Sequence, residues 1–463
     1  MSRQHKAPAL IPRPRDAVVP LTFSQQLTWR LRDLDRSDST RSVAVATLLT
    51  GPLSPEALRQ SFEHVAHHHE ALRTRVIKVG AAVIQAIDEV TASPLDVVDA
   101  TRVPRSERER EAQRKVEELA GEAYRISEGP MFRAVLVRLS DTEHVLGIAM
   151  DHLISDAVSI GILFRDLWTG YHQILRGASV ILSPVQIQFA DYAAWQQHSH
   201  EWWRTKHGPY WQQRLAGARP LRPFAAHTDE TRAVKVTKCP FRIGATTTVR
   251  LRELCRVQHT SLAMGTLAAF IASLAQWCRT DDVVVALVSM GRPQPQIRNT
   301  LGYFGVLLYL RVDVKPDRGF QDLLAAVTSE SLAAHEHADA GYVAAQNPVD
   351  GFSANPRFNW IPRHFGVDPD GPTSAEAIDG AHRIEQRPLA LTPRDDFDER
   401  GGAAELILTD EADGIAGSLC YRADRATPEE VERFTRLFCE SLDRMAIDSR
   451  APVFGRRSEG LRD

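Results

Sequence analysis

Two apolar runs separated by a short polar turn form the most regular hydrophobic pattern in the chain. Residues 132–139 are FRAVLVRL, residues 144–150 are HVLGIAM, and Ser140-Asp141-Thr142 lies between them. Runs of this composition on either side of a turn predict a β-hairpin. The apolar residues that follow recur at spacings of three and four, which predicts a helix that ends near Gly177. They are Ile160, Leu163, Leu167, Tyr171 and Ile174.

Elsewhere the pattern predicts further helices and strands. Ser54 and Pro55 mark the start of a helix, as N-cap and first helical residue, and Leu58 and Phe62 belong to its buried face. Residues 106–119 predict a charged helix with little apolar face, which we expect to be solvated. A second α/β group follows, with helices at 247–257, 262–277 and 320–338 and a buried strand at 283–289.

These elements predict a chain of two α/β units with short tails. We expect a disordered N-terminal tail at residues 1–16, a first lobe at 17–178 that carries residues 151–157, a second lobe at 179–450, and a C-terminal tail at 451–463.

Composition narrows the class of protein. The chain has 463 residues, of which 43% are hydrophobic, so it can bury large cores. A net charge of -3 gives no reason to expect nucleic acid as a partner. Apolar runs such as residues 283–288 are far shorter than a membrane span, and residues 1–20 lack the apolar core of a signal peptide. Five cysteines without a CxxC pair predict reduced packing thiols in a cytoplasmic protein.

The candidate chemistry lies in residues 151–157, DHLISDA, between the predicted hairpin and the helix. A neutral imidazole, with an unperturbed pKa of roughly 6.5, suits general-base work near neutral pH. His152 is therefore a candidate base, and Asp156 a candidate partner of a buried arginine. A plainer interpretation is that His152 ends a strand and Asp156 caps a helix. The spacing alone leaves both interpretations open.

The pattern Asp151-His152-xxx-Asp156-Ala157 resembles the HHxxxDG motif of the condensation domains of nonribosomal peptide synthetases. Other stretches resemble further elements of that family in the same order, over about residues 17 to 446. They are Leu21–Trp29 (S-x-x-Q-x-x-x-W), His68–Val76 (RHEALRTRF), Phe189–Gln196 (Y-x-D-Y-A-x-W-Q), Gly291-Arg292 (GR), Leu301–Gly305 with Leu308–Arg311 (IGYFVNTLPLR), Asn355–Asn359 (NPLFQ) and Tyr421–Asp424 (Y-N-x-D).

The resemblance implies an α/β fold of two chloramphenicol acetyltransferase-like lobes, arranged in a V with the active site in a tunnel between them. It implies an acyltransferase that joins an acyl thioester, held on the phosphopantetheine arm of a carrier protein, to an amine or alcohol. No metal or permanently bound cofactor is expected. Because the chain begins with Met1 and is too short for further synthetase domains, we expect a free-standing, monomeric enzyme of natural-product biosynthesis. It would act on acyl or peptidyl carrier proteins in trans, away from membranes and nucleic acid.

The resemblance also implies roles for single residues. His152 would position or deprotonate the acceptor and stabilise charge on the tetrahedral intermediate. Asp156 would be the structural aspartate, with Arg292 as its candidate partner, although a solvated arginine before a proline is the simpler interpretation of Arg292. Arg73 and Arg75 would brace the cleft.

Two positions depart from the motif: Asp151 replaces its first histidine, and Ala157 replaces its glycine. We expect Asp151 to point away from the imidazole, because adjacent residues of a strand face opposite sides. The alternative is that its charge stabilises the protonated ring. The methyl group of Ala157 could narrow the donor channel or exclude a positive φ.

Two alternatives to this function remain. The chain could be an acyl-CoA-dependent or chain-releasing acyltransferase of the same superfamily, or a catalytically degenerate domain that recruits carrier proteins or tailoring enzymes. His64 and His68 have the i,i+4 spacing of a metal pair, but without a third ligand nearby in the sequence we favour a polar helix face.

Overall fold

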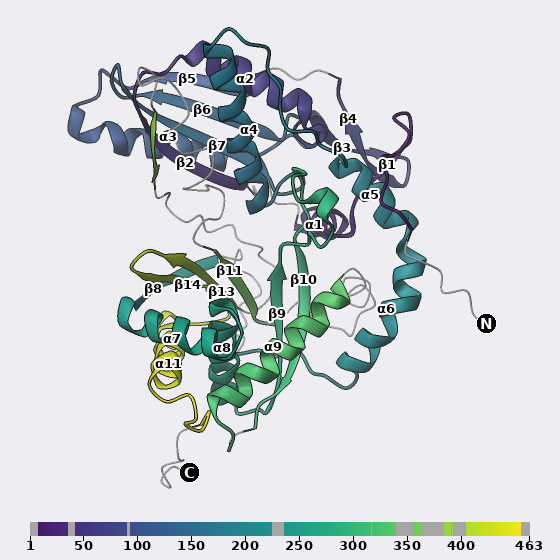
Figure 1. The fold of residues 1–463 in the computed structure, drawn as a ribbon, viewed down its shortest axis with the longest axis vertical. Coiled ribbons are helices and arrows are strands. Elements are labelled where there is room, and N and C mark those ends of the chain that lie inside the picture. The colour runs from purple at the N-terminus through teal and green to yellow at the C-terminus, as the bar shows by residue number, and fades with distance from the viewer. Residues whose placement is uncertain are drawn as a thin grey trace. The chain divides into compact units, whose positions relative to one another are not determined.

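The chain forms two compact units in a computed structural model (Figure 1). Unit 1 comprises Met1–His200, Met290–Gly305 and His364–Arg394, and unit 2 comprises Glu201–Ser289, Val306–Arg363 and Asp395–Asp463. A single cut between residues 178 and 179 therefore does not reproduce these units. The structure describes residues 8–35, 42–89, 93–224, 236–315, 317–338, 355–362, 384–389, 391 and 404–454.

The predicted hairpin lies in the middle of a five-stranded sheet in unit 1. The strand order is β12-β2-β7-β6-β5, with β5 parallel to β6 and the other pairs antiparallel. The strands are β2 (Ser42–Thr50), β5 (Leu95–Asp99), β6 (Phe132–Arg138), β7 (Glu143–Asp151) and β12 (Glu385–Leu389). The prediction of the hairpin is confirmed, whereas β12 comes from a distant part of the sequence.

Helix α3 (Arg108–Gly121) packs against this sheet and is not the solvated helix that the sequence predicts. Ala112, Val116 and Ala120 are buried in a hydrophobic cluster or beside it. Their spacing of four residues makes a narrow stripe of small side chains, which is easily missed among so many charges. The helix lies close to the sheet because Gly147 has no side chain: a Cβ there would lie 2.3 Å from Val116 Cγ2.

Helices α2 (Pro55–His68) and α4 (Ala157–Leu175) pack together in the same unit. As predicted, Ser54 is the N-cap of α2 and accepts a hydrogen bond from the Ala57 amide, and Pro55 is the first helical residue. Ser61 Oγ donates to the Leu167 carbonyl at 2.6 Å. The predicted helix after the hairpin is therefore α4, and Gly177 follows its end with a φ of 67°.

A smaller sheet completes unit 1. Its strand order is β1-β4-β3. Its strands are β1 (Val19–Pro20), β3 (Thr74–Val79) and β4 (Ala82–Ile87). The other helices in the described part of the unit are α1 (Phe23–Asp35), the 3-10 turns η1 (Glu70–Arg73), η2 (Arg105–Glu107) and η3 (Pro295–Ile297), and α5 (Phe189–His198).

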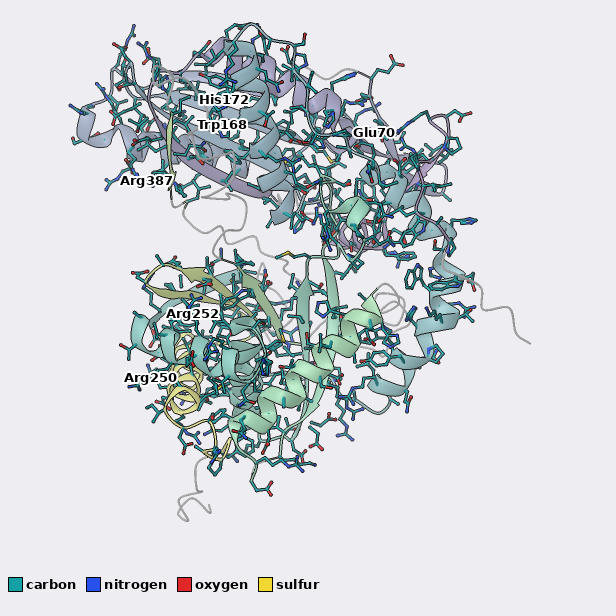
Figure 2. The ribbon with its side chains drawn as sticks, in the orientation of Figure 1. Glu70, Trp168, His172, Arg250, Arg252 and Arg387 are labelled. Atoms are coloured by element: carbon teal, nitrogen blue, oxygen red, sulfur yellow. The ribbon has the colours of Figure 1, made fainter. Side chains whose placement is uncertain are left out.

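Part of the predicted N-terminal tail is anchored to unit 1. Arg13 pairs with Asp191 at 2.7 Å and with Glu70 at 3.0 Å, and its side chain is only 6% exposed. Arg15 also pairs with Glu70, which is labelled in Figure 2. Trp195 Nε1 donates to the Pro8 carbonyl at 2.8 Å. The expectation of disorder is therefore wrong for these residues, because buried acidic groups hold them.

Unit 2 has a six-stranded sheet in the order β10-β9-β11-β13-β14-β8, in which β11 runs parallel to its two neighbours. Its strands are β8 (Val236–Gly244), β9 (Asp282–Ser289), β10 (Val306–Asp313), β11 (Arg357–Ile361), β13 (Ala404–Glu411) and β14 (Gly414–Arg422). Among its described residues, the helices are α6 (His200–Leu215), α7 (Ala245–Val257), α8 (Leu262–Cys278), α9 (Phe320–Glu336) and α11 (Pro428–Ile447). The helices and the strand predicted here are confirmed.

The longest apolar helix of unit 2 is part of its core. Helix α8 contributes buried side chains from Leu267 to Ala275 to one cluster with the sheet and α11. Among the helices that the structure describes, none alone is long and apolar enough to span a membrane, and α7 with α8 reaches that length only as a pair bent by 106°.

Candidate active site

The DHLISDA stretch lies where β7 ends and α4 begins, as the sequence predicts. Strand β7 ends at Asp151, and Asp156 is the N-cap of α4. The turn between them closes on the Asp151 carbonyl, which accepts hydrogen bonds from the Ile154 amide at 3.1 Å and from Ser155 Oγ at 3.0 Å. His152 therefore stands on a short turn whose backbone is tied to the last residue of the strand.

The hydrogen bonds of this turn determine the tautomer of His152. Its Nδ1 lies 2.7 Å from the Ser155 carbonyl oxygen. A carbonyl can only accept, so Nδ1 carries the proton and donates it. In the neutral ring, Nε2 is then the nitrogen with a free lone pair, and the half-buried ring packs on Tyr303 with centroids 4.3 Å apart. This arrangement can accept a proton from a nucleophile at Nε2.

Asp156 is the centre of a buried polar network at the start of α4. Its Oδ1 accepts from the Ser159 amide at 2.9 Å, which caps the helix. Arg292 donates to both carboxylate oxygens, Nη1 to Oδ2 at 2.7 Å and Nη2 to Oδ1 at 3.0 Å. The Phe304 amide donates to Oδ2 at 3.0 Å. The structure thus brings Asp156 and Arg292 together in the predicted ion pair, and Asp156 is also the helix cap of the plainer interpretation.

The segment that carries Arg292 is held close to α4. Gly291 has a φ of 64°, and a Cβ there would lie 1.8 Å from the Phe304 carbonyl oxygen, so a glycine is required. The Arg292 guanidinium lies 4.4 Å from the centroid of the Phe304 ring. Gly302 N donates to Ser159 Oγ at 3.0 Å. These contacts place Tyr303 beside His152.

The structure accommodates both departures from the family motif, Asp151 and Ala157, without a change at His152. The carboxylate of Asp151 faces Arg32, with Nη2 at 2.7 and 3.0 Å from its two oxygens, and not the imidazole. Ala157 is the first residue of α4, exposed and helical, and the positive-φ residues other than glycine in the described part of the chain are His259 and Arg279. A glycine is therefore not required at position 157 by backbone conformation.

Arg73 and Arg75 do not join the motif. Arg73 donates to the backbone carbonyls of Asp88 and His67. Arg75 Nη2 and Nε bind the Asp88 carboxylate at 2.7 and 2.8 Å, and its Nη1 donates to the Ser127 carbonyl. Both arginines therefore stabilise the end of β4, because Asp88 directly follows that strand. Their predicted role, which is to brace the cleft, stays a prediction.

The histidines near the end of α2 differ in burial and in their contacts. His64 is exposed, whereas His68, His69 and Asp166 offer ligand atoms within 4.8 Å of one another. His69 Nε2 lies 2.8 Å from Asp166 Oδ2, and Arg165 Nε donates to Oδ1 at 2.8 Å. Burial lowers the pKa of His69, which keeps the ring neutral beside the carboxylate. Hydrogen bonds thus account for His69 and Asp166, and the half-buried His68 has its own partner, because its Nε2 lies 2.9 Å from the Ser183 carbonyl oxygen.

Sequence reasoning missed three groups around His152. Tyr303 lies within a stretch quoted for its resemblance, but nothing in the sequence links it to the imidazole. Arg32 is 119 positions from Asp151, and Gln25, whose Nε2 donates to the Leu153 carbonyl at 2.8 Å, is 128 positions from that residue. Two signals are present in the sequence: the unusual Asp151, which needs a cation when it is buried, and Gln25, which is the glutamine of the S-x-x-Q-x-x-x-W element.

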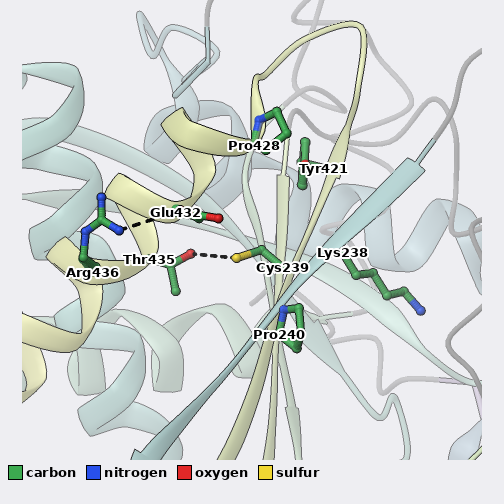
Figure 3. A pocket seen from close by; sticks show the side chains of 8 residues that line it. All are labelled: Lys238, Cys239, Pro240, Tyr421, Pro428, Glu432, Thr435 and Arg436. Carbon is green, nitrogen blue, oxygen red and sulfur yellow. Dashed lines mark hydrogen bonds and ion pairs between the residues drawn. The ribbon is translucent and has the colours of Figure 1, made fainter.

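A pocket of about 430 Å³ occurs in unit 2 (Figure 3). Its lining comes from β8, β14 and α11, and Glu432 pairs with Arg436 at its edge at 3.8 Å. Thr435 Oγ1 and Cys239 Sγ lie 4.0 Å apart in it. None of the residues of the turn that carries His152 lines this pocket. It is therefore not the candidate active site.

Comparison with known proteins gives a family match across the chain. A family model described as Condensation domain matches residues 15–453. Malpinin synthetase of Mortierella alpina is 29% identical over 456 residues, which are 96% of this chain and 6% of that protein. Phosphinothricin tripeptide synthetase PhsC of Streptomyces viridochromogenes is 31% identical over 326 residues, which are 69% of this chain and 30% of that protein. The chain thus spans less than a third of either relative.

Solved structures share the fold at low sequence identity. A chain in the complex of the X-domain and OxyB from teicoplanin biosynthesis superposes with a TM-score of 0.77 and 22% identity, over 97% of this chain and 98% of that chain. The first condensation domain of the calcium-dependent antibiotic synthetase, in complex with a substrate analogue, gives a TM-score of 0.77 and 18% identity, over 95% and 98% of the two chains. At these identities the likeness concerns the fold.

Proposed function

Because the chain belongs to the condensation domain family and has the chloramphenicol acetyltransferase-like fold of that family, we propose that it catalyses amide bond formation in nonribosomal peptide biosynthesis. The donor is an acyl or aminoacyl thioester on the phosphopantetheine arm of a carrier protein, and the acceptor is an amine. An alcohol acceptor, which gives an ester, is the less favoured variant.

In the proposed reaction the acceptor nitrogen attacks the thioester carbonyl carbon. The C–N bond forms, the tetrahedral intermediate collapses, the C–S bond breaks, and the carrier thiol leaves with the proton that the amine gives up. His152 Nε2 accepts this proton or orients the amine. General-base assistance contributes about 10²–10⁴-fold, so alignment of the two substrates supplies much of the remaining acceleration.

The observation that carries the proposal is the hydrogen bond from His152 Nδ1 to the Ser155 carbonyl. It leaves Nε2 as the acceptor in the neutral ring, as a base requires. The Asp156–Arg292 pair supports the same turn from its other end. Neither arrangement is needed by a surface that only binds a partner.

The donor class is tested with separate reactions. The purified chain is mixed with an amine panel and either aminoacyl and fatty-acyl carrier proteins or the matching acyl-CoA esters, and products are detected by mass spectrometry. We expect product with carrier-bound donors in trans. Product from acyl-CoA alone, or release onto a small alcohol, favours the related acyltransferases of the same superfamily.

A second candidate function is recruitment of a carrier protein or tailoring enzyme without catalysis. Two findings favour it: the motif has Asp151 in place of its first histidine, and a structural neighbour is an X-domain in complex with OxyB. A chain with this function would bind a partner stably and yield no product with any donor. We expect the cytoplasm as the site of either function, and a monomer in solution.

A further inference from the structure

Asp151, the residue that departs from the motif, is a buried carboxylate with a dedicated cation. Its side chain is 1% exposed, that of Arg32 is 11% exposed, and Arg32 Nη2 lies 2.7 and 3.0 Å from the two carboxylate oxygens. Arg32 belongs to α1, and Asp151 ends β7. A buried carboxylate without a partner is strongly disfavoured, so Asp151 needs the guanidinium of Arg32 beside it.

The same carboxylate organises the turn that carries His152. Asp151 Oδ1 accepts a hydrogen bond from the Leu153 amide at 2.8 Å. The Asp151 carbonyl accepts from Ser155 Oγ, and the Ser155 carbonyl in turn accepts from His152 Nδ1 at 2.7 Å. An unbroken series of polar contacts therefore leads from Arg32 through Asp151 and the turn to the imidazole.

Helix α1 holds the turn at a second point. Gln25, which is fully buried, donates from Nε2 to the Leu153 carbonyl at 2.8 Å. The backbone carbonyl of Leu153 is thus bonded to Gln25 of α1, and its backbone amide is bonded to Asp151. Movement of α1 relative to β7 would change the orientation of the turn, and with it the orientation of the ring.

We propose that Arg32 is a positioning residue for the condensation reaction, which acts through Asp151 to hold the turn at residues 152–155. The turn in this position keeps the proton of His152 on Nδ1 and the lone pair on Nε2. The inference rests on the proposed role of His152 as the base. It assigns a purpose to the aspartate in DHLISDA: the pair with Arg32 stabilises the turn in a motif that lacks the first histidine.

Two readouts test the proposal, and the first is independent of activity. The chain is labelled with ¹⁵N-histidine, and the His152 ring signals are identified by their loss in His152→Gln. We expect a protonated Nδ1 and an unprotonated Nε2 in the unmodified chain. In Arg32→Met we expect a mixture of tautomers, and in Arg32→Met/Asp151→Asn a return toward the original state, because asparagine can still accept from the Leu153 amide without a buried charge.

The second readout is steady-state kinetics with the best donor and acceptor. We expect Arg32→Met to lower kcat about tenfold or more with little change in KM, since a small misplacement of a catalytic group can cost up to about a hundredfold. The double variant should recover most of this loss, and Arg32→Lys should lie between. Arg59→Met, which removes the exposed ion pairs of Arg59 with Glu56 and Glu63 on α2, is the matched control. If Arg32→Met does not fold, Arg32→Lys and the double variant replace it in both experiments.

The proposal is overturned if Arg32→Met has the same His152 signals and the same kcat as the unmodified chain. This holds even if the melting temperature of Arg32→Met is lower. If the unmodified chain is inactive with every donor, the proposed function fails, and the tautomer measurement still decides whether Arg32 positions the ring.

Discussion

Asp156 and Arg292 are 136 positions apart in the sequence and form a two-point ion pair, with Nη1 2.7 Å from Oδ2 and Nη2 3.0 Å from Oδ1. Their side chains are 9% and 6% exposed. The pair joins the N-terminus of α4 to the Met290–Gly305 segment, which brings Tyr303 to the His152 ring. Its first role is therefore structural, and it acts on chemistry through the placement of that ring.

Breaking this pair should destabilise the protein strongly. Arg292→Met leaves the Asp156 carboxylate buried without its cation, and removal of one partner of such a pair costs about 3–5 kcal/mol. Urea unfolding, monitored by tryptophan fluorescence, measures the loss in the free energy of unfolding. Arg59→Met on the exposed face of α2 should change the unfolding midpoint little. Equal effects of the two substitutions would contradict the assignment of a buried, structural pair.

Gly147 should not tolerate a side chain while Val116 faces it. A Cβ at position 147 would lie 2.3 and 2.9 Å from the two methyl carbons of Val116, so Gly147→Ala should destabilise by about 1–3 kcal/mol through overpacking. Val116→Ala in the same chain removes those methyl groups and should relieve part of the strain. Thermal unfolding of the two single variants and the double variant measures the coupling. Additive losses would show that α3 does not pack there.

Restoring the family glycine at position 157 should have little effect on activity. Ala157 is exposed and helical, so its methyl group does not force a strained backbone. We expect Ala157→Gly to keep kcat/KM within about twofold and to cost less than the roughly 1 kcal/mol that glycine costs in a helix interior, because position 157 is the first residue of the helix. A rise in turnover of tenfold would show that the methyl group obstructs the donor.

Acid should destabilise unit 2 through His207. Burial lowers the pKa of His207 to about 4, and the charges of His337 and Lys206 act in the same direction. As the pH falls below roughly 6.5, the imidazole becomes protonated in the unfolded chain, whereas in the folded protein it stays neutral down to about pH 4. The free energy of unfolding therefore decreases as the pH falls through this range.

His207→Asn removes that titration. The free energy of unfolding should then fall less steeply with acid, by up to about 1.4 kcal/mol per pH unit between those values. Denaturant unfolding at several pH values measures the slope, with exposed His198→Asn as the control. An unchanged slope in His207→Asn would mean that the folded protein binds this proton as readily as the unfolded chain.

The elements of the fold follow closely from hydrophobic periodicity and capping residues, as the hairpin of β6 and β7 and the start of α2 show. Local patterns could not reveal β12, which joins β2 from more than three hundred positions away, or the burial of α3 through a stripe of small residues. The candidate site divides in the same way. His152 and Asp156 stand out by spacing at a strand-to-helix junction, whereas Arg32 and Gln25 approach the turn through tertiary packing alone.

Replacement of His152 shows whether its imidazole takes part in catalysis. Intact-mass analysis should follow product formation by the unmodified chain, His152→Ala and His152→Gln, with exposed His64→Ala as the control, over the same panel of carrier-bound donors and amines. We expect product from the unmodified chain and from His64→Ala, and rates about 10²–10⁴-fold lower in both His152 variants. Equal rates in all four proteins, with every donor and acceptor pair, would contradict a catalytic role for this imidazole.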